Sequence, residues 1–211
     1  MDTESLISQI RRLMASHVAE QVETRTRQFK ILNSKGNDDW FSELCFCILT
    51  ANSSARLGIS IQEAIGPEAF LRLAEEELAT RLRHMGHRFS KRRAHFIVSA
   101  REFSHIKDVV VSIGNEKQAR DWLVKNVLGL GYKEASHFLR NVGYDDLAIL
   151  DRHILRTLCE NRIIDEIPKG LGRCKYLEIE SKLRDLSIQL GMPLSKLDLY
   201  IWYMKTGTVL K

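Results

Sequence analysis

Two side chains of this 211-residue chain, Lys133 and Asp151, could carry out covalent chemistry together. A neutral lysine amine can attack a sugar carbon such as C1′ of a nucleoside and form a Schiff base with the opened sugar. A facing carboxylate can stabilise the oxocarbenium-like charge on the sugar and assist proton transfer. Because an ordinary lysine is almost entirely protonated at neutral pH, such a site must desolvate the amine, place cations nearby or supply a base.

Each residue also has a simpler interpretation. Lys133 stands near the start of an expected helix, where it could be a surface lysine. Asp151 directly precedes the helical pattern of residues 152–160, where it could serve as an N-cap. The elements around the two residues must therefore decide between these interpretations.

The segment before Lys133 predicts a helix–hairpin–helix motif over residues 121–142. One helix is expected to end at Val127, and the turn Leu128-Gly129-Leu130-Gly131 leads into the next. Two glycines allow positive-φ turns and close backbone approach, and the N–H groups that begin the second helix can bind a phosphate. Gly129 and Gly131 are therefore candidate DNA-backbone contacts, although an ordinary helical hairpin with a glycine cap would explain the pattern too.

Positive charge is concentrated in residues 81–101. This segment holds seven Arg and Lys and no Asp or Glu, so against a total of +5 the remaining chain carries −2. Phenylalanines interleave these cations, a combination that suits a phosphate backbone and an unstacked base. The alternative is a solvated helix face.

The rest of the chain predicts an all-α fold. Apolar residues recur at helical spacing, and Asn115 with Gln118 forms a capping-box pattern that opens a helix through Val127. Two final helices, 174–190 and 194–204, are separated by Gly191-Met192-Pro193, and only residues 109–113 look strand-like. We expect a single unit over residues 1–211, with two helical lobes and an active-site cleft between them.

Composition narrows the class of protein. With 44% hydrophobic and 28% charged residues the chain is ordinary and globular, and no apolar run is long enough to span a bilayer. The N-terminus lacks a signal-peptide profile, which predicts a cytoplasmic, nucleoid-associated protein. Four cysteines are too few for a disulfide scaffold, and we expect them to be small buried residues rather than ligands of a metal or iron–sulfur cluster.

Longer motifs carry a resemblance. The strings GLGYKEASHFLRNVG and LAILDRHILR, at 129–143 and 147–156, resemble the helix–hairpin–helix DNA glycosylase superfamily. Across nearly the whole chain the sequence is most similar to the archaeal type 2 8-oxoguanine DNA glycosylase/AP lyase family. Supporting motifs are ILTANSSA (48–55), GHRFSKRRAHFIV (86–98) and YIWYMKTGTVLK (200–211).

The resemblance implies roles for individual residues. Lys133 would be the nucleophile and Asp151 the second catalytic residue. Phe89 and Trp202 would hold the flipped base between them, and the terminal Lys211 would discriminate 8-oxoguanine from guanine. In addition, Arg88 would lie near the estranged cytosine, and we expect the neighbouring Lys91 and Arg92 to contact DNA.

The implied enzyme is bifunctional, excising 8-oxoguanine from double-stranded DNA and cleaving abasic sites by β-elimination. It would act as a monomer without an iron–sulfur cluster, with carbonyls of residues 128–131 as the place for a structural monovalent cation. Three alternatives stay open: a non-catalytic DNA-binding module, a glycosylase for another lesion, and a small-molecule lyase with a Schiff-base lysine.

Overall fold

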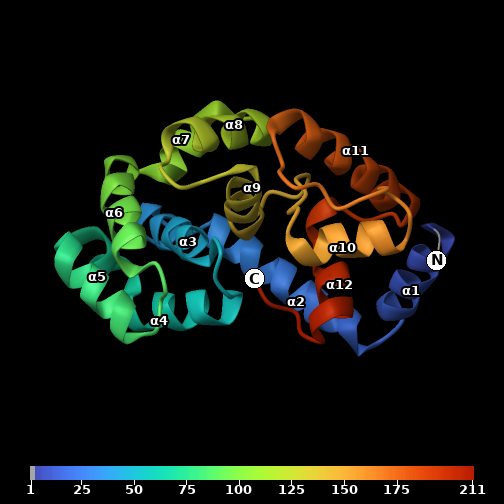
Figure 1. Cartoon of the computed structure of the whole chain (residues 1–211), viewed down its shortest axis with the longest axis horizontal. Helices are drawn as coiled ribbons and strands as arrows, with labels where there is room; N and C mark the ends of the chain where they lie inside the picture. The colour runs from blue at the N-terminus through green and yellow to red at the C-terminus, as the bar shows by residue number, and fades with distance from the viewer. Residues whose placement is uncertain (1–2) are drawn as a thin grey trace. The chain divides into compact units, whose positions relative to one another are not determined.

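The structure is a computed structural model that describes residues 3–211. Over this range the chain forms α-helices joined by short loops, and no strand is present in the described part (Figure 1). The elements, in order, are α1 (Thr3–Met14), α2 (His17–Asn33), α3 (Asn37–Thr50), α4 (Ala55–Arg72), α5 (Glu75–His84), α6 (Ser90–Ala100), the 3₁₀ turn η1 (Arg101–Phe103), α7 (Ile106–Ile113), α8 (Glu116–Asn126), α9 (Tyr132–Asn141), α10 (Arg152–Glu160), α11 (Arg173–Gln189) and α12 (Leu194–Thr206). The expected all-α class is confirmed.

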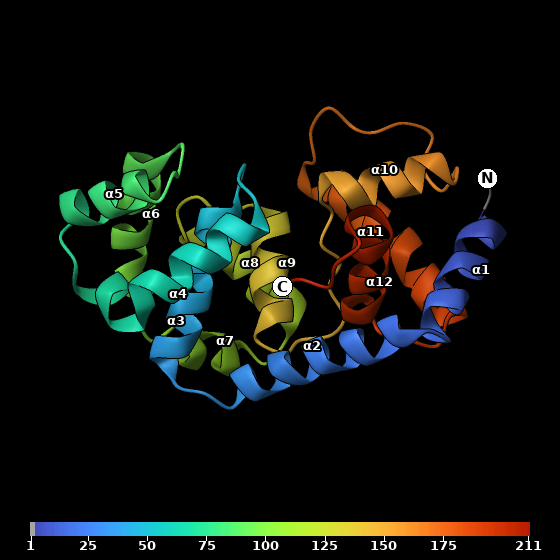
Figure 2. The same ribbon diagram turned by 90° about the horizontal axis from the view of Figure 1, so that it is seen from below.

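The helices form two compact units. One, called here the terminal unit, combines the residues up to 29 with residues 143–211, and the other, the central unit, is the continuous segment 30–142. Figure 2 lets the chain be followed through α2, within which the boundary between the two units falls. Within residues 3–211, no helix is long and apolar enough to cross a membrane.

The central unit is built around α3. Every residue from Trp40 to Thr50 is buried, because this helix is apolar on nearly all sides and contacts α4, α6, α7 and α9. Its one acidic side chain within that stretch, Glu43, accepts hydrogen bonds from Asn141 (2.6 Å) and Gln62 (3.1 Å). The buried carboxylate therefore ties the end of α9 and the middle of α4 to the core helix.

The terminal unit is organised around α12, which contacts α1, α10 and α11. The predicted break before this helix is confirmed, since Gly191 adopts a φ of 65° and Pro193 is the N-cap of α12. The helical spacing of Leu194, Leu197, Ile201 and Met204 predicts a core-facing stripe on this helix, and the first three are buried while Met204 is only half-buried.

Two expectations about local structure are wrong. Residues 109–113 belong to helix α7 rather than a strand, because Ile106 and Val110 lie one helical turn apart and are buried together, and α7 packs on α3. The cysteines are free, but Cys174 is exposed at the start of α11 and Cys159 is partly exposed, so only Cys45 and Cys47 are the small buried residues expected. At residues 109–113, tertiary packing therefore outweighs the strand preference of the β-branched valines.

Candidate active site

The predicted hairpin joins α8 to α9 in the central unit. Asn115 caps α8 by accepting the backbone N–H groups of Lys117 and Gln118, as the capping-box pattern indicates. Gly129 adopts a φ of +89°, and a Cβ built on it would lie 2.3 Å from Cδ2 of Phe96. Glycine is therefore required there both by backbone conformation and by the ring of α6 that packs against it.

Gly131 does not make the second positive-φ turn that the sequence suggested. Its φ is −98° and it is the N-cap of α9, so its backbone is extended. Glycine has no side chain to cap the first turn, and the Gly131 N–H instead donates to Oε2 of Glu134 at 3.3 Å. The remaining N–H groups of that turn have no side-chain cap.

Polar contacts fix the start of α9 against α8. The Tyr132 hydroxyl donates to Oδ1 of Asp121 at 2.5 Å. Arg120, almost fully buried, donates to the Ser136 hydroxyl at 3.2 Å and lies 5.3 Å from the centre of the Tyr132 ring. These contacts define the position of the backbone that carries Lys133.

Lys133 is partly buried on the first turn of α9. Its side chain is 24% exposed, and Nζ lies 3.6 Å from Oε1 of Glu134. The amine is therefore partly shielded from solvent and lies beside a carboxylate, unlike the amine of a freely solvated surface lysine. Glu134 was not predicted as a site residue, although the residue next to a candidate nucleophile is a place where a proton acceptor could be sought.

The basic segment divides into exposed and buried cations. Arg88, Lys91 and Arg92 are exposed around the N-terminus of α6. Positive side chains at a helix N-terminus oppose the helix dipole, so helix stability does not account for their placement. In contrast, Arg93 is 5% exposed and His87 is 3% exposed, so the segment does not face solvent as a whole.

Phe89 is half-buried at the N-cap of α6, and the Arg88 guanidinium lies 4.5 Å from its ring centre. The Phe89 N–H donates to Nδ1 of His87, whose Nε2 is 3.0 Å from the Leu49 carbonyl oxygen. These partners require a neutral ring with the proton on Nε2. Burial lowers the pKa of His87, more than the Leu49 contact raises it, and nearby Arg93 lowers it further.

Arg93 joins the basic segment to the loop between α3 and α4. Its Nη2 donates to the Ala51 carbonyl at 2.5 Å, directly before Asn52, which adopts a φ of 59°. The guanidinium lies 6.0 Å from the Phe89 ring centre, and its Nε has no hydrogen-bond partner among the described residues. Burial lowers the pKa of Arg93, and Glu134 opposes that effect. Arg93 and Asn52 were not predicted as site residues.

Asp151 lies in the terminal unit as the N-cap of α10. Its Oδ1 accepts the Ile154 N–H at 2.8 Å, which confirms the capping interpretation. Within residues 3–211 its other oxygen has no hydrogen-bond or ion-pair partner, and the carboxylate is only partly buried. A cap that uses one carboxylate oxygen leaves the second available for chemistry.

Trp202 lies on α12 of the same unit and is half-buried. Its ring meets the His153 ring edge to face, with centres 5.0 Å apart, and its buried Nε1 has no hydrogen-bond partner in the described part of the chain. His153, two residues after Asp151, was not predicted. Beyond α12, Gly207 adopts a φ of 69°, and the tail ends at a partly buried Lys211.

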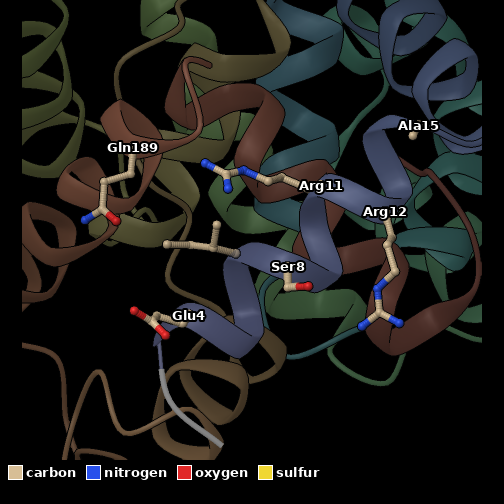
Figure 3. A pocket seen from close by; sticks show the side chains of 7 residues that line it. Glu4, Ser8, Arg11, Arg12, Ala15 and Gln189 are labelled. Atoms are coloured by element: carbon tan, nitrogen blue, oxygen red, sulfur yellow. The ribbon is translucent and has the colours of Figure 1, made fainter.

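The structure thus distributes the predicted residues between the units. Lys133, Phe89 and the exposed cations belong to the central unit, while Asp151, Trp202 and Lys211 belong to the terminal unit. A separate surface pocket of about 590 Å³ in the terminal unit is lined by α1 residues, among them Arg11 and Arg12, and by Ala15 and Gln189 (Figure 3). None of the predicted site residues lines this pocket.

Comparison with known proteins decides the family. The family model described as 8-oxoguanine DNA glycosylase matches residues 22–192, most of the chain. This chain belongs to the 8-oxoguanine DNA glycosylase family. The resemblance seen in its motifs is therefore confirmed.

Individual members of the 8-oxoguanine DNA glycosylase family match over their full length. An 8-oxoguanine DNA glycosylase/AP lyase of Methanocaldococcus jannaschii is 58% identical over 98% of this chain and 99% of its own. One from Korarchaeum cryptofilum is 48% identical over the whole of both chains. The crystal structure of the Methanocaldococcus jannaschii 8-oxoguanine glycosylase/lyase in complex with a 15mer DNA containing 8-oxoguanine has a TM-score of 0.96, with 57% identity over 98% of this chain and 100% of that one.

Proposed function

We propose that this protein excises 8-oxoguanine from DNA and then cleaves the backbone at the resulting abasic site. The observation that carries the proposal is the partly buried Lys133, which lies on the first turn of the helix after the hairpin, in a chain that belongs to the 8-oxoguanine DNA glycosylase family. An amine in that setting suits covalent catalysis on a deoxyribose held by its backbone. The implied location of the enzyme is the chromosomal DNA inside the cell, where we expect it to act as a monomer.

The reaction conserves atoms and charge in two stages. In the first, Nζ of Lys133 forms a bond to C1′ while the bond from C1′ to N9 of the base breaks, and ring opening then leaves a protonated Schiff base. In the second, a proton leaves C2′ and the C3′–O bond breaks, which is β-elimination. The carboxylate of Asp151 stabilises the positive charge on the sugar during base departure.

The other predicted residues bind the substrate. Phe89 and Trp202 each offer a half-buried ring, which suits stacking on an extrahelical base, and Lys211 supports discrimination of that base. Around the strand, Arg88, Lys91 and Arg92 supply exposed positive charge for phosphates. The backbone at Gly129 and Gly131 supports close approach of the DNA.

The lysine chemistry itself needs no metal or organic cofactor. A structural monovalent cation would be held by hairpin carbonyls. The residues fit such an ion, because the loop and cap hydrogen bonds of residues 3–211 leave the carbonyl oxygens of Leu128, Gly129 and Leu130 without a backbone donor. Carbonyl oxygens are suitable ligands for hard cations. Bound there, the cation would supply positive charge toward a DNA phosphate.

The proposal is tested by trapping with sodium borohydride, which reduces a Schiff base to a stable adduct. Duplexes carry 8-oxoguanine, guanine, uracil or thymine glycol and are incubated with the wild-type protein or Lys133→Gln. We expect an adduct with 8-oxoguanine that is absent in the variant. An adduct mainly with another lesion would assign a different substrate, and full strand scission by Lys133→Gln would overturn the role of the lysine.

A further inference from the structure

We propose that Glu134 is a catalytic residue that carries protons away from the Lys133 amine during attack and ring opening. This inference rests on the proposed function, since it concerns the same nucleophile. The contact that motivates it is the 3.6 Å separation between Nζ of Lys133 and Oε1 of Glu134.

Two contacts place the Glu134 carboxylate, and a third group interacts with its charge. Its Oε2 accepts the Gly131 N–H at 3.3 Å, which fixes the carboxylate at the hairpin end of α9. Its Oε1 faces Nζ of Lys133, and its charge acts on the buried Arg93 of α6. The side chain is only 16% exposed, so the carboxylate is not a solvated surface group. Adjacent helical residues do not normally face each other, which makes this pairing specific to the first turn of α9.

Proton balance explains why an acceptor is needed at this atom. A resting lysine ammonium carries three protons on Nζ, whereas the protonated Schiff base carries one. The two protons released must reach the departing base, at N9, and the ring oxygen O4′, which becomes a hydroxyl when the sugar opens. A carboxylate beside Nζ can accept each proton and pass it on, so that no proton is lost or gained overall.

Besides Lys133 on its own helix, Glu134 interacts electrostatically with the buried Arg93 of α6, so the carboxylate is placed between cations of two helices. The separation of 3.6 Å is longer than a proton-transfer hydrogen bond, as is common for catalytic groups before the substrate binds.

The test uses a duplex with a pre-formed abasic site, on which Schiff-base formation needs proton loss from Nζ but no base departure. Glu134→Gln keeps an oxygen for the Gly131 N–H and keeps the side-chain volume, but it cannot carry a proton. We expect the rate of borohydride trapping to fall about 10²-fold, with duplex affinity and thermal stability unchanged. Glu76→Gln, which makes the same charge change at an exposed position of α5, should behave as wild type.

A second variant separates chemistry from structure. Added formate should raise the trapping rate of Glu134→Ala at least tenfold over the rate without formate, because a small carboxylate can occupy the vacated space and accept the proton. Trapping by Glu134→Gln within threefold of wild type, or no formate rescue of Glu134→Ala, would overturn the role of Glu134 while wild-type trapping stands. Absence of an adduct with the wild-type protein would instead count against the proposed function.

Discussion

The Oδ1 atom of Asp151 accepts the backbone N–H of Ile154 at 2.8 Å, so one carboxylate serves both as the cap of α10 and as a candidate catalytic group. Asparagine caps a helix about as well as aspartate, whereas alanine costs about 1 kcal/mol. We therefore expect Asp151→Asn to keep its unfolding free energy and to lose at least 10²-fold in single-turnover excision of 8-oxoguanine.

Urea unfolding and excision kinetics on Asp151→Asn and Asp151→Ala check this separation. Asp151→Ala should lose both stability and activity. If Asp151→Asn excises the base at the wild-type rate, the carboxylate is a cap and nothing more.

Replacing Gly129 by alanine should destabilise the hairpin. The added Cβ meets both an unfavourable φ of +89° and the Phe96 ring at 2.3 Å, which together cost about 2–4 kcal/mol. Gly131→Ala is the matched control, because its φ is −98° and its Cβ would meet only Oε2 of Glu134, at 3.3 Å. Chemical denaturation measures both.

The steric part of that cost can be isolated with Phe96→Ala. In the double variant the clash is absent, so the two substitutions should be less destabilising together than their separate effects sum to. Strict additivity would contradict the assigned contact between Gly129 and Phe96.

Stability should depend on pH through His87. Burial lowers its pKa in the folded protein, so below about pH 6.5 the unfolded chain binds a proton that the folded chain excludes. The unfolding free energy should therefore decrease as the pH falls from 6.5, by up to about 1.4 kcal/mol per pH unit until the folded-state pKa is reached.

Urea titrations at pH 7, 6 and 5 isolate this effect as the difference between the wild type and His87→Gln, because other groups titrate in both. The variant should show the weaker dependence on pH. An identical dependence in the two proteins would show that His87 titrates in the folded state much as in the unfolded chain.

Deleting Lys211 should weaken 8-oxoguanine excision at least tenfold and spare strand cleavage at a pre-formed abasic site. The lesion carries a proton on N7 where guanine has an acceptor, so polar groups from the chain terminus that favour the lesion would oppose guanine. Single-turnover assays on the two substrates, with the exposed Lys169→Ala as control, measure the split. Equal loss of both activities would indicate a folding role for the tail.

Local signals in the sequence predicted the elements well. The Asn115 cap, the glycine-marked turn and the break at Gly191 depend on residues only a few positions apart. The structure has all three, although of the two hairpin glycines only Gly129 adopts a positive φ. The strand-like run at 109–113 failed because burial of α7 against α3 determines its structure, which no window of five residues reveals.

The supporting residues of the site were beyond local signals for the same reason. Arg93 reaches Ala51 across 42 positions of sequence, and His87 reaches Leu49 across 38. Both looked like members of a solvent-facing cationic stretch, and only the packing of α6 beside α3 shows that they are buried. Glu134 was missed for another reason. An acidic residue at the start of a helix is common, and nothing in the sequence indicated that its partner is the adjacent lysine.

The division of the chain has a consequence for biosynthesis. The central unit is one uninterrupted stretch, so all of it, including its lysine, is synthesised before residues 143–211 of the terminal unit. The terminal unit combines segments on both sides of that stretch, so α1 can pack on α12 only after residues 194–206 have been made. The nascent chain can therefore complete the unit that bears the amine while the unit that bears the aspartate is still unfinished.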